Sequence, residues 1–146
     1  TWTHPGGTVS SIGILNPPLF NYLLTPIVSI NWEPRFVTFV IAMINSAAVA
    51  FFFLIIQRYY NLNIALISSI LFALSPWAIL YSRKIWMQDL LIPFFLLVFY
   101  SIHKLLIDKK KIYWLPYVAG SLALIQLHQI TIIFIVILTL FLIKKT

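Results

Sequence analysis

The sequence contains no cysteine and very few acidic residues. Without a thiol, the chain has no disulfide, no thiol nucleophile, no thiolate metal site and no iron–sulfur cluster. Charged residues make up only 9% of its 146 positions, and the acids are limited to Glu33, Asp89 and Asp108. A soluble domain carries about 25% charged residues. This chain therefore has too little polar surface to cover a particle that folds in water.

Apolar residues are present in excess. They account for 62% of the sequence, and the mean hydropathy is +0.99. These values predict an integral membrane protein, in which lipid replaces water around most of the surface. A net charge of +7 would favour nucleic acid binding in a soluble protein, but in a membrane protein it is typical of cytoplasmic loops. We therefore expect membrane lipids, and no nucleic acid, among the partners.

Residues 1–35 are rich in glycine, proline, serine and threonine, which is typical of loops and turns. Within this loop, Asn16-Pro17-Pro18 precedes a short apolar run, a pattern that predicts a helix with Asn16 as its N-cap. A helix of about 14 residues is too short to cross a bilayer, so we expect it to lie at the membrane interface. Position 1 is not Met, and we expect the chain to be a piece of a longer protein.

Residues 36–146 form the predicted membrane region. The 32 residues of its last apolar stretch, 112–143, contain no charge, and as one helix they would exceed the roughly 30 Å thickness of the hydrocarbon core. Polar residues around His128 lie at the middle of this stretch, so we expect two helices joined there in a hairpin. The predicted fold is an all-α polytopic helical bundle with about five transmembrane helices, at 36–57, 63–82, 88–107, 113–127 and 129–143.

The basic residues determine the expected orientation. Five crossings place seven of the ten lysines and arginines on one side and three on the other. The larger group consists of Arg58, Lys104, Lys109, Lys110, Lys111, Lys144 and Lys145. This distribution obeys the positive-inside rule when the larger group is cytoplasmic. The N-terminal loop, the 82–89 turn and the His128 turn then share the non-cytoplasmic face, and we expect the plasma membrane as the location.

The 82–89 turn contains the best candidates for chemistry. Arg83 and Lys84 are suited to hold a phosphate, Asp89 is suited to a hydroxyl or a divalent metal, and Gln88 is a candidate for lining the same site. The alternative is an interfacial belt in which Arg83 or Lys84 simply pairs with Asp89.

Polar residues elsewhere receive weaker assignments. His128 is expected to contact the same phosphate, with Gln129 beside it, because a polar residue in a membrane segment is a functional candidate. The alternative is a structural histidine that caps the hairpin backbone. His4 is a minor candidate for lining the site. Asn45 is interpreted as a helix-packing residue, and Lys104 as a helix end whose ammonium extends to the interface.

Three stretches of the sequence resemble a known enzyme class. They are Ser75-Pro76 with Ser82-Arg83 and Asp89, the loop segment 13–24 with Asn16-Pro17-Pro18-Leu19-Phe20-Asn21-Tyr22, and the segment 120–128. They resemble the polytopic glycosyltransferases that use polyprenyl-phosphate sugars, the GT-C superfamily. This superfamily includes the protein O-mannosyltransferases, the lipid A aminoarabinose transferase and the bacterial family 39 members. The resemblance covers nearly the whole chain.

The resemblance implies roles for particular residues. Asp89 matches the acid at the start of the family's fourth span, which lies in an external cavity near the donor phosphate. Arg83 matches the arginine six positions before that acid, and His128 matches the basic residue at the turn that contacts the lipid phosphate. The family's leading acid, usually an Asp-Glu pair at the end of the first span that activates the acceptor hydroxyl, has no match here. We therefore expect this chain to be an incomplete fragment that is inactive by itself.

The predicted function is that of a membrane glycosyltransferase. It would move a hexosyl or pentosyl group from a polyprenyl-phosphate-linked donor to a hydroxyl of a lipid, glycan or protein. The sequence leaves open whether the enzyme requires a divalent metal. The main alternative is a transporter or lipid flippase, which predicts polar groups and broken helices at mid-bilayer, and a structural membrane subunit is the third. No HExxH, P-loop, GxSxG or dinucleotide-binding pattern occurs in the sequence.

Overall fold

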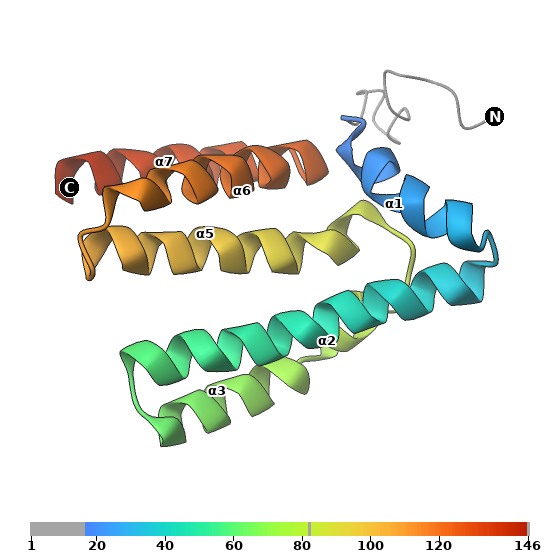
Figure 1. The fold of residues 1–146 in the computed structure, drawn as a ribbon, viewed down its shortest axis with the longest axis horizontal. Helices are drawn as coiled ribbons and strands as arrows, with labels where there is room; N and C mark the ends of the chain where they lie inside the picture. The colour runs from blue at the N-terminus through green and yellow to red at the C-terminus, as the bar shows by residue number, and fades with distance from the viewer. Residues whose placement is uncertain (1–16, 82, 146) are drawn as a thin grey trace.

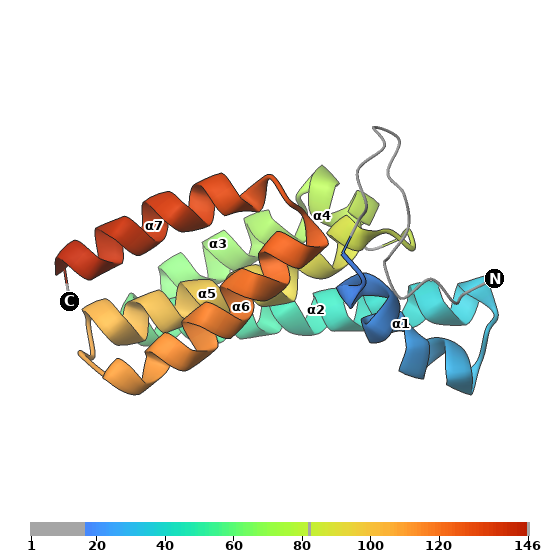
Figure 2. The ribbon, with the colours of Figure 1, turned by 90° about the horizontal axis from the view of Figure 1, so that it is seen from above.

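The computed structural model describes residues 17–81 and 83–145, and within these ranges all regular structure is helical. The helices lie roughly along one direction in an elongated bundle (Figures 1 and 2). In chain order they are α1 (Leu19–Ile30), α2 (Pro34–Tyr59), α3 (Leu62–Ala73), α4 (Pro76–Tyr81), the 3-10 helix η1 (Met87–Leu90), α5 (Leu91–Leu106), the 3-10 turn η2 (Lys111–Tyr113), α6 (Trp114–Leu127) and α7 (Thr131–Lys145).

Two helical segments are long and apolar enough to cross a membrane. They are Pro34–Tyr59, which is α2, and Met87–Leu106, which combines η1 with α5. The helices α1 and α3 are apolar but shorter, with 12 residues each. The all-helical class predicted from the sequence is confirmed for the described residues, whereas the predicted count of five crossings stays a prediction.

The first helix begins later than predicted. Its N-cap position is Pro18, and no side chain caps it. Asn16, the predicted N-cap, lies outside the described residues. The two prolines of the pattern account for the start at this point, because a proline at the beginning of a helix lacks only an N–H that the first turn would leave unpaired anyway.

The apolar run predicted as one helix over 63–82 is divided into α3 and α4, which is a correction to the sequence-based prediction. In a continuous helix the carbonyl of Phe72 would accept a hydrogen bond from position 76, but Pro76 has no N–H. The carbonyl accepts instead from the N–H of Ser75, at 3.2 Å. Proline also disfavours the helical conformation of the residue before it, so α3 ends and α4 starts anew at Pro76.

The last apolar stretch forms two helices. α6 ends at Leu127 and α7 begins at Thr131, with His128 at the C-cap of α6. The hydroxyl of Thr131 donates to the carbonyl of His128 at 2.7 Å, which satisfies an acceptor at the turn. α7 runs back toward the start of α6 (Figure 2). The hydroxyls of Tyr117 and Thr139 join the two helices at 2.7 Å.

Two buried clusters hold the bundle together. One joins α5, α6 and α7 and consists of Val98, Leu105, Tyr117, Leu124, Ile135 and Leu142. The other joins α1, α2, η1 and α6 and consists of Leu24, Val37, Ile41, Leu90 and Leu127. Gly120 allows α6 to approach α5 closely, because a Cβ atom there would lie 2.9 Å from Cγ2 of Val98. The second cluster fixes the end of the bundle where η1 and the α6–α7 turn meet.

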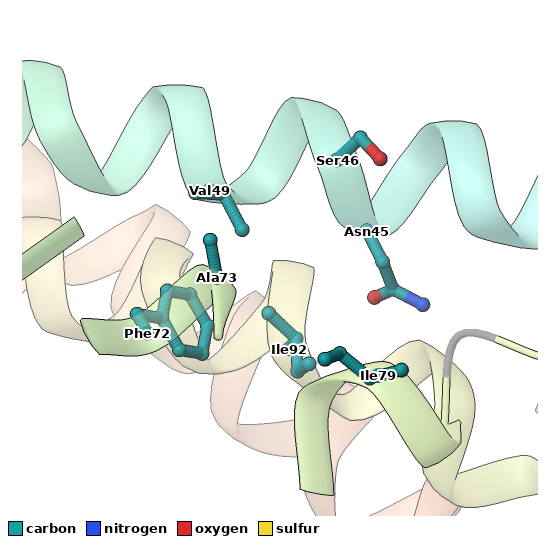
Figure 3. Close-up of a pocket in the computed structure, with 7 residues that line it drawn as sticks. All are labelled: Asn45, Ser46, Val49, Phe72, Ala73, Ile79 and Ile92. Carbon is teal, nitrogen blue, oxygen red and sulfur yellow. The ribbon is translucent and has the colours of Figure 1, made fainter. Parts of the chain in front are cut away.

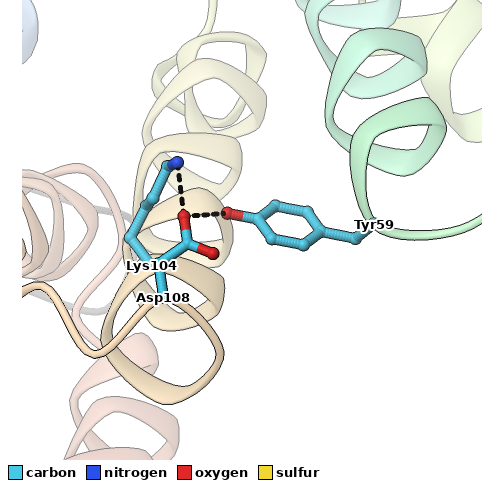
Figure 4. Close-up of polar contacts among 3 residues, drawn as sticks. All are labelled: Tyr59, Lys104 and Asp108. Atoms are coloured by element: carbon cyan, nitrogen blue, oxygen red, sulfur yellow. Dashed lines mark hydrogen bonds and ion pairs between the residues drawn. The ribbon is translucent and has the colours of Figure 1, made fainter.

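Lys104 does not extend to the interface, contrary to the sequence-based prediction. Its side chain is 3% exposed, and its ammonium donates to the carboxylate of Asp108 at 2.6 Å (Figure 4). The hydroxyl of Tyr59 donates to the same carboxylate oxygen at 3.4 Å, and the ammonium lies 5.4 to 5.9 Å from the rings of Tyr59, Tyr100 and Tyr113. A counter-ion one helical turn away makes burial of the lysine possible. The hydrogen bond from Lys104 holds the pKa of Asp108 below its ordinary value.

Candidate functional site

The candidate residues occupy one end of the bundle. η1, the loop that precedes it and the α6–α7 turn lie at this end, whereas the α5–α6 turn and the end of α7 lie at the other (Figure 1). Leu90, next to Asp89, and Leu127, next to His128, belong to the same buried cluster. The structure therefore brings the backbones around Asp89 and His128 together, and it places both away from the lysine-rich turn at 109–111.

Asp89 is completely buried, with an exposed fraction of 0%. Its Oδ2 accepts a hydrogen bond from the N–H of Trp86 at 2.6 Å, and its own N–H donates to the carbonyl of Trp86 at 3.0 Å. These two bonds close the first turn of η1, in the way that an acid at the third position of a helix caps its start. Its Oδ1 has no hydrogen-bond partner among the described residues. One carboxylate oxygen therefore has a structural role, and the other is buried and unpaired.

Asn45 on α2 contacts Asp89 from across the bundle. Its Nδ2 donates to the backbone carbonyl of Asp89 at 3.0 Å, and its side chain is 5% exposed. The residue four positions after Asp89 is Pro93, which cannot donate the hydrogen bond that a helix would supply to that carbonyl. The amide of Asn45 replaces the missing donor. Asn45 thus connects α2 to η1 and fixes the backbone that carries the candidate acid.

Arg83 and Lys84 lie in the loop before η1, and both are exposed. The ammonium of Lys84 lies 5.9 Å from the ring centre of Trp86. Within residues 17–81 and 83–145, no ion pair joins either cation to Asp89. Asp89 therefore has no direct ion pair in the described part of the chain, although the charge of Lys84 acts on its carboxylate. Both cations remain accessible to an anionic group.

The other predicted residues have varied positions. His128 is half-buried at the end of α6, and Gln129 follows it, exposed in the turn. Gln88 is half-buried in η1, and its Oε1 has no hydrogen-bond partner in the described part of the chain. His4 lies outside the described residues. The assignment of Arg83, Lys84 and His128 to one phosphate stays a prediction.

Asn45 joins the candidate site through the structure. The sequence predicts a helix-packing residue there, and its hydrogen bond between α2 and η1 is such a contact. Asn45 also lines a cavity of about 250 Å³ between α2, α3, α4 and α5 (Figure 3). The signal was present in the sequence, because an amide in the middle of an apolar span is a functional candidate in its own right. Its partner, 44 positions away, was not visible without the fold.

The described residues offer no cluster of three or more histidine, aspartate or glutamate side chains that would hold a metal ion. The arrangement offers one buried carboxylate oxygen, buried amide oxygens and exposed cations near a bundle end. Such groups can accept hydrogen bonds from hydroxyls and neutralise an anionic phosphate.

The described residues combine apolar helices with a buried carboxylate and two exposed cations near one end of the bundle. A family model described as dolichyl-phosphate-mannose-protein mannosyltransferase matches residues 15–146. The chain belongs to this family, and the family indicates a membrane glycosyltransferase of the GT-C type. No curated protein and no solved structure matches the chain.

Proposed function

We propose that this protein transfers a sugar from a polyprenyl-phosphate-linked donor to a hydroxyl of a lipid, glycan or protein acceptor, on the non-cytoplasmic face of the plasma membrane. In such a transfer the acceptor oxygen bonds to the anomeric carbon while the bond from that carbon to the phosphate oxygen breaks. The hydroxyl proton passes to a base, and the polyprenyl phosphate leaves with the bonding electrons. The enzyme contributes by positioning the reactants and by neutralising the leaving phosphate.

The environment of Asp89 is the observation that carries this proposal. A fully buried carboxylate without an ion pair is rare in proteins. The Oδ1 atom of Asp89 is buried and has no hydrogen-bond partner among the described residues. A purely structural cap requires only Oδ2. We assign to Oδ1 a hydrogen bond from a hydroxyl of the bound substrate, which makes Asp89 the catalytic residue of this chain.

We assign the donor phosphate to Arg83, Lys84 and His128. Arg83 and Lys84 are exposed and unpaired with any acid among the described residues, so they are accessible to an anion. The His128 turn shares the buried cluster with the start of α5, because Leu127 and Leu90 are both members of it. His128 is thereby kept near η1, which follows the loop of the two cations.

We place part of the donor's polyprenyl chain in an apolar pocket of about 370 Å³. The pocket lies beside α5 and begins next to the α6–α7 turn. It is lined by Phe72, Leu91, Ile92, Phe95, Leu96, Leu124, Thr131 and Phe134. A chain in this position would keep the phosphate of the donor at the bundle end where the cations lie.

Donor binding tests the phosphate assignment. Arg83→Ala and His128→Ala should each weaken the affinity for polyprenyl-phosphate mannose in nanodiscs, and the double variant should be non-additive because both side chains contact one phosphate. Arg83→Lys should restore binding only in part, since an ammonium lacks the two-pronged geometry of the guanidinium. Arg58→Ala is the control. Arg58 lies in the last turn of α2, at the end of the bundle away from η1 and His128, so this variant should bind the donor normally. Unchanged affinity in both single variants, with lowered melting temperatures, would make these residues structural and leave the transporter and structural-subunit alternatives standing.

A further inference from the structure

Exposed basic residues gather at the end of the bundle opposite to η1. Arg58 is in the last turn of α2, Lys144 and Lys145 are in the last turn of α7, and Lys109–Lys111 lie between α5 and α6. Figures 1 and 2 both show the end of α2, the α5–α6 turn and the end of α7 at this end of the bundle. We call these six residues the basic end.

Contacts between the elements support this grouping. The charge of Arg58 acts on the carboxylate of Asp108, and the hydroxyl of Tyr59 donates to that carboxylate at 3.4 Å. The end of α2 is therefore next to the α5–α6 turn. Leu142 of α7 and Leu105 of α5 belong to one buried cluster. This cluster brings the end of α7 to the same place.

The basic end has no acid to neutralise it. Asp108 forms its ion pair with the buried Lys104 at 2.6 Å, and no ion pair joins an acid to the basic end in the described part of the chain. The other two acids of the sequence, Glu33 at the start of α2 and Asp89 in η1, lie at the opposite end of the bundle. Like charges that are close together repel one another. The basic end is therefore suited to an anionic partner.

The backbone at Lys109 is unfavourable for a lysine. Its φ is 54°, in the left-handed region that glycine adopts most easily. This conformation turns the chain back after α5, and the N–H of Lys110 donates to the carbonyl of Lys104 at 3.1 Å. Glycine would make the same turn at a lower conformational cost. A contact between the ammonium of Lys109 and a ligand would explain why lysine occupies this position.

Apolar side chains lie on both sides of these lysines. Ile107 is 59% exposed and Ile112 is 72% exposed. A nucleic acid or an acidic soluble protein would neutralise the cations but would leave the isoleucines in water. An anionic phospholipid offers a phosphate to the ammonium groups and acyl chains to the isoleucines. We propose that the basic end binds the headgroups of anionic phospholipids, with Lys109–Lys111 as the main contact.

Native mass spectrometry of the full-length protein tests this assignment. The protein is purified in detergent and titrated with dioleoyl phosphatidylglycerol or dioleoyl phosphatidylcholine, which share their acyl chains and differ in net charge. We expect phosphatidylglycerol to bind at least about fivefold more tightly, which is the contribution of one lysine near an anionic surface. Equal affinity for the two lipids would overturn the proposal.

A triple variant and a matched control locate the lipid on the protein. Lys109→Gln, Lys110→Gln and Lys111→Gln together remove three charges, and this variant should lose the preference for phosphatidylglycerol. Arg35→Gln removes a charge from an exposed position in the first turn of α2, at the opposite end of the bundle, and should retain the preference. A preference that survives in the triple variant would refute the assignment.

Lys109→Gly separates lipid binding from folding. Glycine suits the left-handed backbone, so the Tm should be equal to that of the native protein or higher. The affinity for phosphatidylglycerol should nevertheless fall about fivefold, because one ammonium is lost. Unchanged affinity would show that Lys109 does not contact the lipid.

Two competitors distinguish a lipid from other anions. Millimolar glycerol phosphate carries the same phosphate chemistry without acyl chains, and short polyuridine RNA is a polyanion without an apolar part. Neither should displace phosphatidylglycerol. Complete displacement by glycerol phosphate would identify a site for free phosphate, and RNA binding that depends on the same lysines, without a preference for phosphatidylglycerol, would identify a nucleic acid surface. Either result would overturn the proposal.

Discussion

Replacing Asn45 with leucine removes the donor that serves the Asp89 carbonyl. That carbonyl cannot accept the hydrogen bond that an α-helix would supply from four residues later, because Pro93 occupies that position, and its hydrogen bond to Asn45 is buried at 3.0 Å. A buried acceptor without a partner costs about 1 to 3 kcal/mol. The new leucine recovers part of this through apolar contacts, so we expect a net loss of about 1 to 2 kcal/mol, or roughly 2 to 8 °C in Tm.

The proline provides the test of this explanation. Pro93→Ala by itself supplies an N–H to the same carbonyl. In that background Asn45→Leu should lower the free energy of unfolding by less than about 0.5 kcal/mol. The double-mutant cycle of the two substitutions should show a coupling energy of at least about 1 kcal/mol. Unfolding by SDS in mixed micelles, followed by circular dichroism, gives the four free energies. If Asn45→Leu is equally destabilising with Pro93 and with Ala at position 93, the amide does not compensate for the missing N–H, and our account of the α2–η1 contact is wrong.

Two further predictions concern packing and orientation. Gly120→Ala should lower the free energy of unfolding by about 1 kcal/mol in the same assay. The added Cβ atom would lie 2.9 Å from Val98, and this overpacking outweighs the better helix propensity of alanine. An unchanged or higher free energy of unfolding would show that α5 and α6 can separate without cost. Single cysteines at Gln88 and Lys110 should react with impermeant maleimide from opposite sides of sealed vesicles, and labelling of both from the same side would contradict the proposed orientation.

The positions of the helices followed largely from local patterns. The start of α2, the segment Met87–Leu106 and the break after Leu127 lie within a few residues of the boundaries expected from apolar run length and the polar group at His128. The break at Pro76 was missed although proline interrupts helices locally. The length of the apolar run predicts a span over 63–82, but it does not show where a missing backbone N–H interrupts the helix.

The contacts of the site depended on the fold. Asp89 is a candidate from the sequence, and its cap on Trp86 is a local contact three residues apart, but its burial follows from the packing of η1 against α2 and α6. The contact of Asn45 joins positions 44 residues apart, and apolar periodicity contains no information on such a pair. Lys104 was assigned to the interface although Asp108, one turn later, offered a counter-ion. A single sequence shows that such a pair is possible but does not show whether neighbouring helices bury it.

The most direct test of the central claim is sugar transfer by the Asp89→Asn variant of the full-length protein, in membranes of cells that express it. Asparagine retains an acceptor for the Trp86 N–H, at 2.6 Å from Asp89 in the native protein, and replaces the unpaired carboxylate oxygen with an amide donor. Glu33→Gln makes the same chemical change at an exposed residue and serves as the control. We expect Asp89→Asn to lower transfer from polyprenyl-phosphate mannose by about 100-fold or more with normal membrane insertion, and Glu33→Gln to remain within about twofold. Near-normal transfer by Asp89→Asn would show that Asp89 only caps η1 and would contradict its assignment as the catalytic residue.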